Sequence, residues 1–155
     1  EIPFDFSFMQ QLTFFHKDVT MEEFLKEGIK KGDKGIFFIQ SAEKAYKLYS
    51  KYKKDCVFNC SANNKKYYDY VDREKIKEIL INQKFEEKFL ITTSCFDAGI
   101  NIIDADVKHI VIDIVDIGSL IQCIGRKRIQ NEDDKIHVYI KIINNQYTQY
   151  QLQCA

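Results

Sequence analysis

The chain has 155 residues, of which 45% are hydrophobic and 30% charged, a globular mixture that excludes a disordered or collagen-like chain. Lysine plus arginine and aspartate plus glutamate both number 23, so the formal net charge is zero. That balance leaves no broad basic field to drive non-specific nucleic-acid binding, although it does not exclude a narrow track of backbone amides and hydroxyl groups.

At this length we expect a single domain, 1–155, with one hydrophobic core, and we assign no structure to the tail at 144–155. Because the first residue is Glu1 and not Met, we expect a piece of a longer protein. No apolar stretch is long enough to span a bilayer and no signal peptide opens the chain, so we expect a cytoplasmic protein with no membrane partner.

Helix and strand patterns alternate along the chain. In chain order, we expect a strand or an incoming connection at 2–15, a helix at 20–31, a strand at 34–40, a helix at 42–53, a strand at 55–60, a loop at 61–70, a helix at 72–82, strands at 88–94 and 107–114, the start of a helix at 119–125 and a strand at 135–143. Thr20 and Glu23 resemble a capping box, and Gly32 stands just past the end of the same helix.

Strands separated by helices imply β-α-β units with right-handed crossovers. The fold class is therefore α/β, with a parallel β-sheet flanked by helices on both faces. The run at 34–40 supports this, since nearly continuous apolar residues are typical of a parallel strand covered on both sides. Ligands of such sheets bind at the carboxyl ends of the strands, so we expect a binding site there.

The segment ITTSCFDAGIN, 91–101, ends a predicted strand with hydroxyl side chains. Hydroxyl groups such as those of Thr93 and Ser94, together with backbone amides at a strand end, can hold a phosphate without a formal charge, and Gly99 lets the backbone approach a ligand. The alternative is an ordinary strand-to-loop transition in which the hydroxyl groups satisfy local backbone atoms.

The segment QCIGRKR, 122–128, brings an amide and two guanidinium groups together. Only three residues of the chain are arginine, and Arg126 and Arg128 are two of them, which indicates a need for a planar fork of donors. An arginine aimed at a triphosphate can neutralise the charge that develops during phosphoryl transfer. The alternative is a solvated basic turn.

Taken in order, KGIFFIQSAEKAYKLY, ITTSCFDAGIN and SLIQCIGRKR resemble motifs IV, V and VI of the C-terminal RecA-like motor domain of superfamily 2 helicases. The family form of motif V is a threonine, five residues and Gly-Ile-Asp, and that of motif VI is Gln-x-x-Gly-Arg-x-x-Arg. The resemblance covers about residues 20 to 143, and it implies a RecA-like fold and an ATP-dependent helicase activity.

The resemblance also implies roles for individual residues. Ser61, Thr93 and Ser94 match positions that touch the nucleic-acid backbone. Gly99, Asn101 and Gly125 match positions near the nucleotide. Gln122 and Arg126 match catalytic positions of motif VI, with Arg126 as the first arginine finger, and Arg128 is a further catalytic candidate next to the position of the second arginine.

This sequence departs from the family pattern at two places. Asn101 replaces the usual aspartate, which keeps a hydrogen bond but removes a carboxylate. Ile129 occupies the position of the second arginine, and Arg128 comes one residue early, which on a helix is about 100° of rotation.

The chain contains no G-x-x-x-x-G-K-[ST] loop and no Asp-Glu run at a strand end. In the family these lie in the first motor domain. The resemblance therefore implies that ATP and Mg²⁺ are bound mainly by an N-terminal RecA-like domain of the same protein. This chain would supply half of that site and half of a track for single-stranded DNA or RNA, and alone it would be inactive.

Two other functions fit the same residues. One is a non-catalytic α/β module that binds a nucleotide or nucleic acid, and the other is the translocase domain of a restriction subunit. The cysteines and histidines add no further site, because their spacing fits neither a disulfide framework nor a four-ligand zinc site. We expect reduced structural thiols at Cys56, Cys60, Cys95, Cys123 and Cys154.

Overall fold

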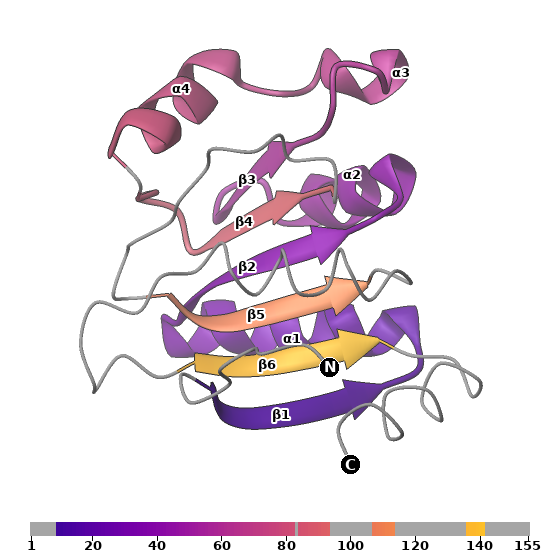
Figure 1. The fold of residues 1–155 in the computed structure, drawn as a ribbon, viewed down its shortest axis with the longest axis vertical. Coiled ribbons are helices and arrows are strands. Elements are labelled where there is room, and N and C mark those ends of the chain that lie inside the picture. Colours follow the sequence, from indigo (N-terminus) through magenta and orange to yellow (C-terminus); the bar gives the residue numbers. More distant parts are fainter. Residues whose placement is uncertain (1–8, 83, 94–106, 114–135, 142–155) are drawn as a thin grey trace, which may run out of the picture.

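The computed structural model describes residues 9–82, 84–93, 107–113 and 136–141 (Figure 1). Its elements are β1 (Met9–Phe15), α1 (Asp18–Lys31), β2 (Lys34–Ile39), α2 (Ala42–Lys51), β3 (Cys56–Asn59), α3 (Lys65–Tyr68), α4 (Arg73–Asn82), β4 (Phe89–Thr92), β5 (Val107–Asp113) and β6 (Ile136–Lys141). The alternation expected from the sequence is confirmed in these ranges, and the helix expected from residue 119 lies outside them.

All the described strands join one six-stranded parallel sheet in the order β1-β6-β5-β2-β4-β3. β2 lies between β5 and β4, and Phe37, Phe38 and Ile39 in it are no more than 2% exposed. This burial explains why the strand reads as a continuous apolar run. The predicted parallel α/β sheet is confirmed, and β1 shows that a strand lies within the predicted 2–15 segment.

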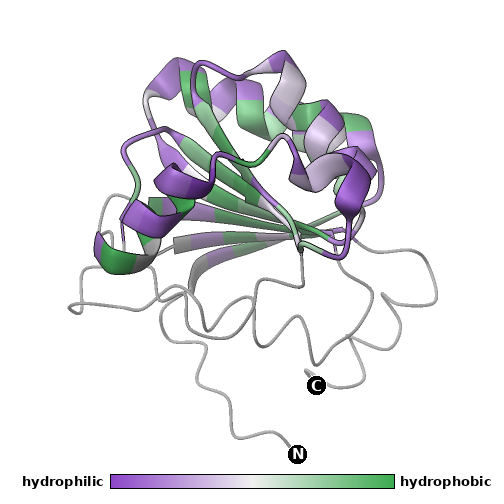
Figure 2. Cartoon of the chain, turned by 90° about the horizontal axis from the view of Figure 1, so that it is seen from above, coloured by the Kyte–Doolittle hydropathy of each residue, from purple (hydrophilic) through white to green (hydrophobic). Residues whose placement is uncertain are grey.

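Helices α1 and α2 pack on one face of the sheet (Figures 1 and 2). Leu25 of α1 and Ala45 of α2 belong to the same buried cluster as Phe37 and Phe58. The connections β1–α1–β2 and β2–α2–β3 cross the sheet in the same direction, so right-handed crossovers place both helices on the same side.

The opposite face of the sheet is buried as well. Ile36, Leu90, Ile110 and Val138, which alternate with the residues of the first face, are 0% exposed. The sheet is therefore buried on both faces, and the described helices α1 and α2 cover one of them. Helices α3 and α4 lie past the β3 edge of the sheet (Figure 1).

The capping box predicted at Thr20 and Glu23 is wrong, because α1 begins two residues earlier, at Asp18. Lys17 is the N-cap residue, with no side-chain cap, and its carbonyl accepts from the amide of Thr20 at 3.1 Å. Asp18 in the first turn provides the negative charge that favours a helix start. The predicted end is confirmed: Gly32 adopts the left-handed conformation, at a φ of 78°.

The segment 61–70 was predicted to be a loop, but it contains the short helix α3. Tyr67 and Tyr68 in this helix pack against the buried cluster of the first face, and such packing outweighs the weak local helical preference of so short a segment. The next helix agrees with the prediction within one residue: the Asp72 carboxylate accepts from the amide of Lys75 at 3.1 Å and precedes α4.

The described cysteines are buried free thiols, Cys56 and Cys60. Burial, with a smaller effect of Asp55, raises the pKa of Cys56 to about 12, so its thiol is unreactive at neutral pH. Within the described ranges, no helix is long and apolar enough to cross a membrane. The same ranges hold no group of three or more His, Cys, Asp or Glu side chains that could bind a metal.

Candidate functional site

Polar side chains gather at the carboxyl ends of the parallel strands. Ser61 follows β3 and Thr93 follows β4, and these strands are neighbours in which Asn59 pairs with Thr92. The topology therefore brings these two predicted nucleic-acid contacts to the same edge of the sheet. Within this edge, the Asn59 side-chain amide donates to the Thr92 hydroxyl at 3.3 Å, a buried bond between the two strand ends.

Ser61 and Thr93 differ in accessibility. Ser61 is partly exposed, and its hydroxyl oxygen accepts from the backbone amide of Asn63 at 3.1 Å, which holds a tight turn. An oxygen engaged as an acceptor leaves its hydroxyl hydrogen able to donate to a ligand. Thr93 is 0% exposed, so its side chain does not reach the surface in this arrangement.

The remaining predicted site residues lie outside the described residues. These are Ser94, Gly99, Asn101, Gln122, Gly125, Arg126 and Arg128. Their roles stay predictions.

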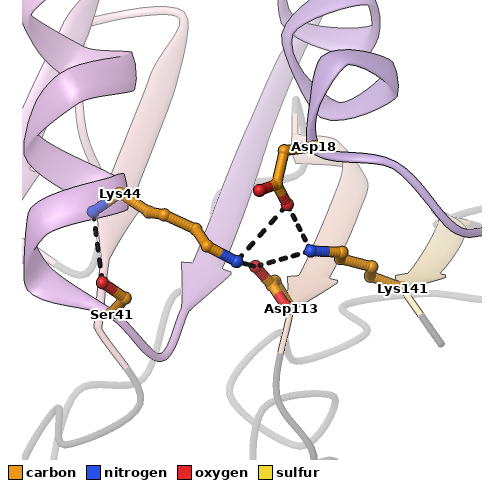
Figure 3. A network of polar contacts seen from close by, with 5 residues as sticks. All are labelled: Asp18, Ser41, Lys44, Asp113 and Lys141. Atoms are coloured by element: carbon orange, nitrogen blue, oxygen red, sulfur yellow. Dashed lines mark hydrogen bonds and ion pairs between the residues drawn. The ribbon is translucent and has the colours of Figure 1, made fainter. Parts of the chain in front are cut away.

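An alternating network of four charges, missed by the sequence analysis, occupies the other half of the edge (Figure 3). Lys44 Nζ lies 3.1 Å from Asp113 Oδ2 and 3.4 Å from Asp18 Oδ1. Lys141, at the end of β6, bonds Asp18 and lies 3.8 Å from Asp113. The network joins the first turns of α1 and α2 to the ends of β5 and β6.

The pKa values in this network follow from its geometry. Burial alone would raise the pKa of Asp18, but the hydrogen bond and charge of Lys141, with those of Lys44, lower it overall. Burial alone would lower the pKa of Lys44, but its bond to Asp113 and the charges of both carboxylates raise it. Asp18 and Lys44 are therefore held in their charged forms.

A cavity of about 260 Å³ opens between α1 and α2 beside this network. Three lysines line it, and each has a carboxylate partner: Lys44 pairs with Asp113, Lys47 with Glu43 at 2.9 Å, and Lys51 with Glu22 at 3.0 Å. The cavity therefore offers no unneutralised cation to a phosphate. The signal for the network in the sequence is weak: a single aspartate ends the run HIVID, and a single lysine follows HVYI.

No protein-family model matches the chain. No curated protein matches it either. Solved structures do match. "Mss116p (NTE and C-tail double deletion) bound to ssRNA and AMP-PNP" superposes with a TM-score of 0.65 at 15% identity, over 95% of this chain and 30% of that one.

Saccharomyces cerevisiae Dbp5 bound to RNA and ADP BeF3 matches with a TM-score of 0.63 at 18% identity, over 96% of this chain and 39% of that one. The Pyrococcus furiosus Hef helicase domain matches with a TM-score of 0.53 at 16% identity, over 88% of this chain and 28% of that one. At these identities the likeness establishes the fold. The chain has the fold of a RecA-like helicase domain and spans between 28% and 39% of the length of these solved chains.

Proposed function

We propose that this chain is the C-terminal motor domain of an ATP-dependent nucleic-acid helicase or translocase. The observation that supports it most is the fold, because two chains with the same fold are bound to RNA together with a nucleotide or its analogue. The chain contributes half of a track for single-stranded DNA or RNA, and Arg126 contributes an arginine finger to a neighbouring domain.

The nucleic-acid contacts would lie at the ends of the neighbouring strands β3 and β4. Ser61 offers a hydroxyl hydrogen at the end of β3, and Ser94 and Thr93 follow the end of β4. These contacts are neutral hydrogen bonds to the sugar-phosphate backbone, which position a strand without reading its sequence. Because Thr93 is fully buried, its side chain takes part only if the edge opens when the strand binds.

ATP and Mg²⁺ do not fit the described residues alone. The lysines that line the cavity between α1 and α2 are paired with carboxylates, and the described residues contain no cluster that could hold a metal. We therefore assign both mainly to an N-terminal RecA-like domain of the same protein. Gly99, Asn101 and Gly125 would face the nucleotide from this side, and Gln122, Arg126 and Arg128 would face its terminal phosphate. The protein would act in the cytoplasm.

The role of this chain would be to complete a site that opens and closes. When the two domains approach, a guanidinium fork from Arg126 stabilises the charge that develops on the transferred phosphoryl group. When they separate, the strand contacts at Ser61, Thr93 and Ser94 shift relative to those of the first domain, which moves the protein along the strand.

The test is ATP hydrolysis by the full-length protein and by the 155-residue chain, each with and without single-stranded DNA and RNA. The full-length protein should hydrolyse ATP with stimulation by one of the strands, and the chain alone should show no activity. Hydrolysis by the purified chain itself, or a full-length protein without strand-stimulated hydrolysis, would contradict the proposal.

A further inference from the structure

We propose that a tyrosine platform at the end of β3 stacks against bases of single-stranded nucleic acid, with Tyr70 as the outermost ring. The platform consists of Tyr46, Tyr67 and Tyr70. This inference rests on the proposed function and adds a base-contacting surface to it, where the strand-end hydroxyls would touch only the backbone.

The three rings come from separate elements and meet at one place. Tyr46 lies on α2, Tyr67 on α3, and Tyr70 follows α3. The ring centroids of Tyr46 and Tyr70 are 4.3 Å apart at an interplanar angle of 30°, and those of Tyr46 and Tyr67 are 5.7 Å apart at 37°. Tyr70 is 53% exposed, which is unusual for a ring so well packed on one side.

The platform has a rigid base. Tyr46 meets Phe58 of β3 edge-on, with centroids 5.6 Å apart at 72°, and Phe58 is 2% exposed. The amide of Tyr70 donates to the carbonyl of Tyr67 at 3.0 Å, and the next residue, Val71, is buried in the core cluster. Because these rings are already ordered, a base that stacks on them loses little conformational entropy from the protein side.

Cations lie over the platform ring Tyr67 and over the adjacent Tyr68, which is not part of the platform. Lys66 Nζ lies 5.4 Å from the centroid of the Tyr67 ring, and the guanidinium of Arg73 lies 4.6 Å from that of Tyr68. Lys65 is exposed beside them. The nearby carboxylates are Glu43, whose charge interacts with that of Lys66, the exposed Asp69, and Asp72, which accepts from the amide of Lys75. Aromatic rings interleaved with cations are the arrangement by which proteins hold single strands without sequence preference.

The position of the platform in the fold favours single-stranded nucleic acid as its ligand. The short turn that begins at Ser61 leads directly into α3, and α3 lies at the carboxyl side of β3 (Figure 1). A strand whose backbone meets Ser61 therefore passes within reach of the platform, with its phosphates near Lys65 and Lys66 and a base over Tyr70.

The experiment measures binding of the full-length protein to two fluorescein-labelled 20-nucleotide probes, oligo-dT and an abasic strand of the same length, without ATP. Tyr70→Ala should weaken binding to oligo-dT by about 5- to 150-fold, the range expected for one lost base stack. Tyr70→Phe should bind like wild type because it keeps the ring. The abasic strand should bind wild type more weakly than oligo-dT does, and Tyr70→Ala should leave its affinity unchanged.

Val19→Ala serves as the matched control, because Val19 is an exposed apolar side chain, 61% accessible, on α1. An equal loss of affinity of Tyr70→Ala for both strands would show a role in local folding and overturn the inference. Unchanged affinity for oligo-dT, together with intact strand-stimulated ATP hydrolysis, would overturn the inference and leave the proposed function standing. Absence of both strand binding and ATP hydrolysis in wild type would overturn both.

Discussion

Lys44, in the first turn of α2, reaches across the end of β2 to Asp113 at the end of β5, with 3.1 Å between Nζ and Oδ2. The same carboxylate lies beside Lys141, and its side chain is only 16% exposed. Asp113 is therefore a partly buried anion shared by two lysines, and its ion pair with Lys44 links α2 to the carboxyl edge of the sheet.

We expect Asp113→Asn to lower the free energy of unfolding by about 1–3 kcal/mol, because two partly buried cations lose a charged partner while the shape is kept. Urea unfolding at neutral pH measures this change. Glu43→Gln removes the exposed i,i+4 partner of Lys47 and should have a smaller effect. Equal effects of the two variants would show that the network is solvated and contributes no more than a surface pair.

The second prediction concerns acid sensitivity at the amino ends of β5 and β6. Burial, followed by the charge of His109, lowers the pKa of His137 below its ordinary value of 6.5. The neutral ring accepts from or donates to the Thr13 hydroxyl at 2.7 Å and stacks on Tyr139 with centroids 3.9 Å apart. The groups that face this pair of histidines are Tyr139 and Asp33, which both bond His109.

A lowered folded-state pKa means that the unfolded chain binds the proton more readily. The contribution of His137 to stability is therefore complete above pH 6.5 and is lost as the pH falls through the lower folded-state pKa. His137→Phe, which keeps a ring but cannot titrate, should show a smaller loss of stability between about pH 7.5 and about pH 5.5 in urea unfolding. Identical pH profiles for wild type and His137→Phe would rule this mechanism out.

The third prediction concerns the close contact between β2 and the Phe89 ring. A Cβ atom added at Gly35 would lie 2.6 Å from Phe89 Cε1 and 2.8 Å from the carbonyl oxygen of His109. Gly35→Ala should therefore destabilise the protein by about 1–3 kcal/mol through overpacking. A double-mutant cycle with Phe89→Leu separates the two contacts: the double variant should be more stable than the sum of the single changes predicts, because the smaller side chain relieves the clash. Strict additivity would mean that the ring is not the obstacle.

The fourth prediction concerns Arg126 in the full-length protein. If Arg126 reaches across the cleft, Arg126→Ala should leave ATP affinity nearly intact and lower the hydrolysis rate on the order of 10³- to 10⁵-fold. Arg126→Lys should restore little, because a point charge on a flexible stem does not reproduce the planar fork. Arg128→Ala should cost less, owing to its displacement by one residue. The measurement is the ATP hydrolysis rate of each variant at saturating ATP and nucleic acid. A more severe defect in Arg128→Ala than in Arg126→Ala would assign the arginine finger to Arg128.

The sequence predicts an element well where burial determines which residue types the element contains. The runs of β2 and β5 are apolar because both faces of these strands are covered, so their positions and type were predictable. The start of α1 was not, because Asp18 supports the helix as a charge while Thr20 only matches a spacing pattern. The helix α3 was missed for a related reason: what fixes Tyr67 is the packing of its ring on Tyr46, a contact between residues far apart in the sequence.

The same distinction holds for the candidate site: its place in the sheet was predictable from the sequence, and its side-chain contacts were not. The topological rule for parallel sheets was enough to bring Ser61 and Thr93 to neighbouring strand ends. The rule says nothing of side-chain partners, so it gave no indication that Thr93 is buried or that Lys44 and Lys141 share Asp113. Likewise, the sequence pattern indicated only that Tyr70 belongs to a polar loop. Its packing on the ring of Tyr46, which lies on α2, is visible only in the structure.

The strand order has a consequence for synthesis on the ribosome. β1 pairs only with β6 among the described strands, and Thr13 and His137, which bond across this pair, are 124 residues apart in the chain. Among the described strands, β1 therefore leaves the exit tunnel before its partner and stays unpaired in this sheet until β6 has been synthesised. During that interval its backbone donors and acceptors are open to other chains, as on any unpaired strand edge. A nascent chain arrested before β6 should bind chaperones through β1, while one arrested after it should not.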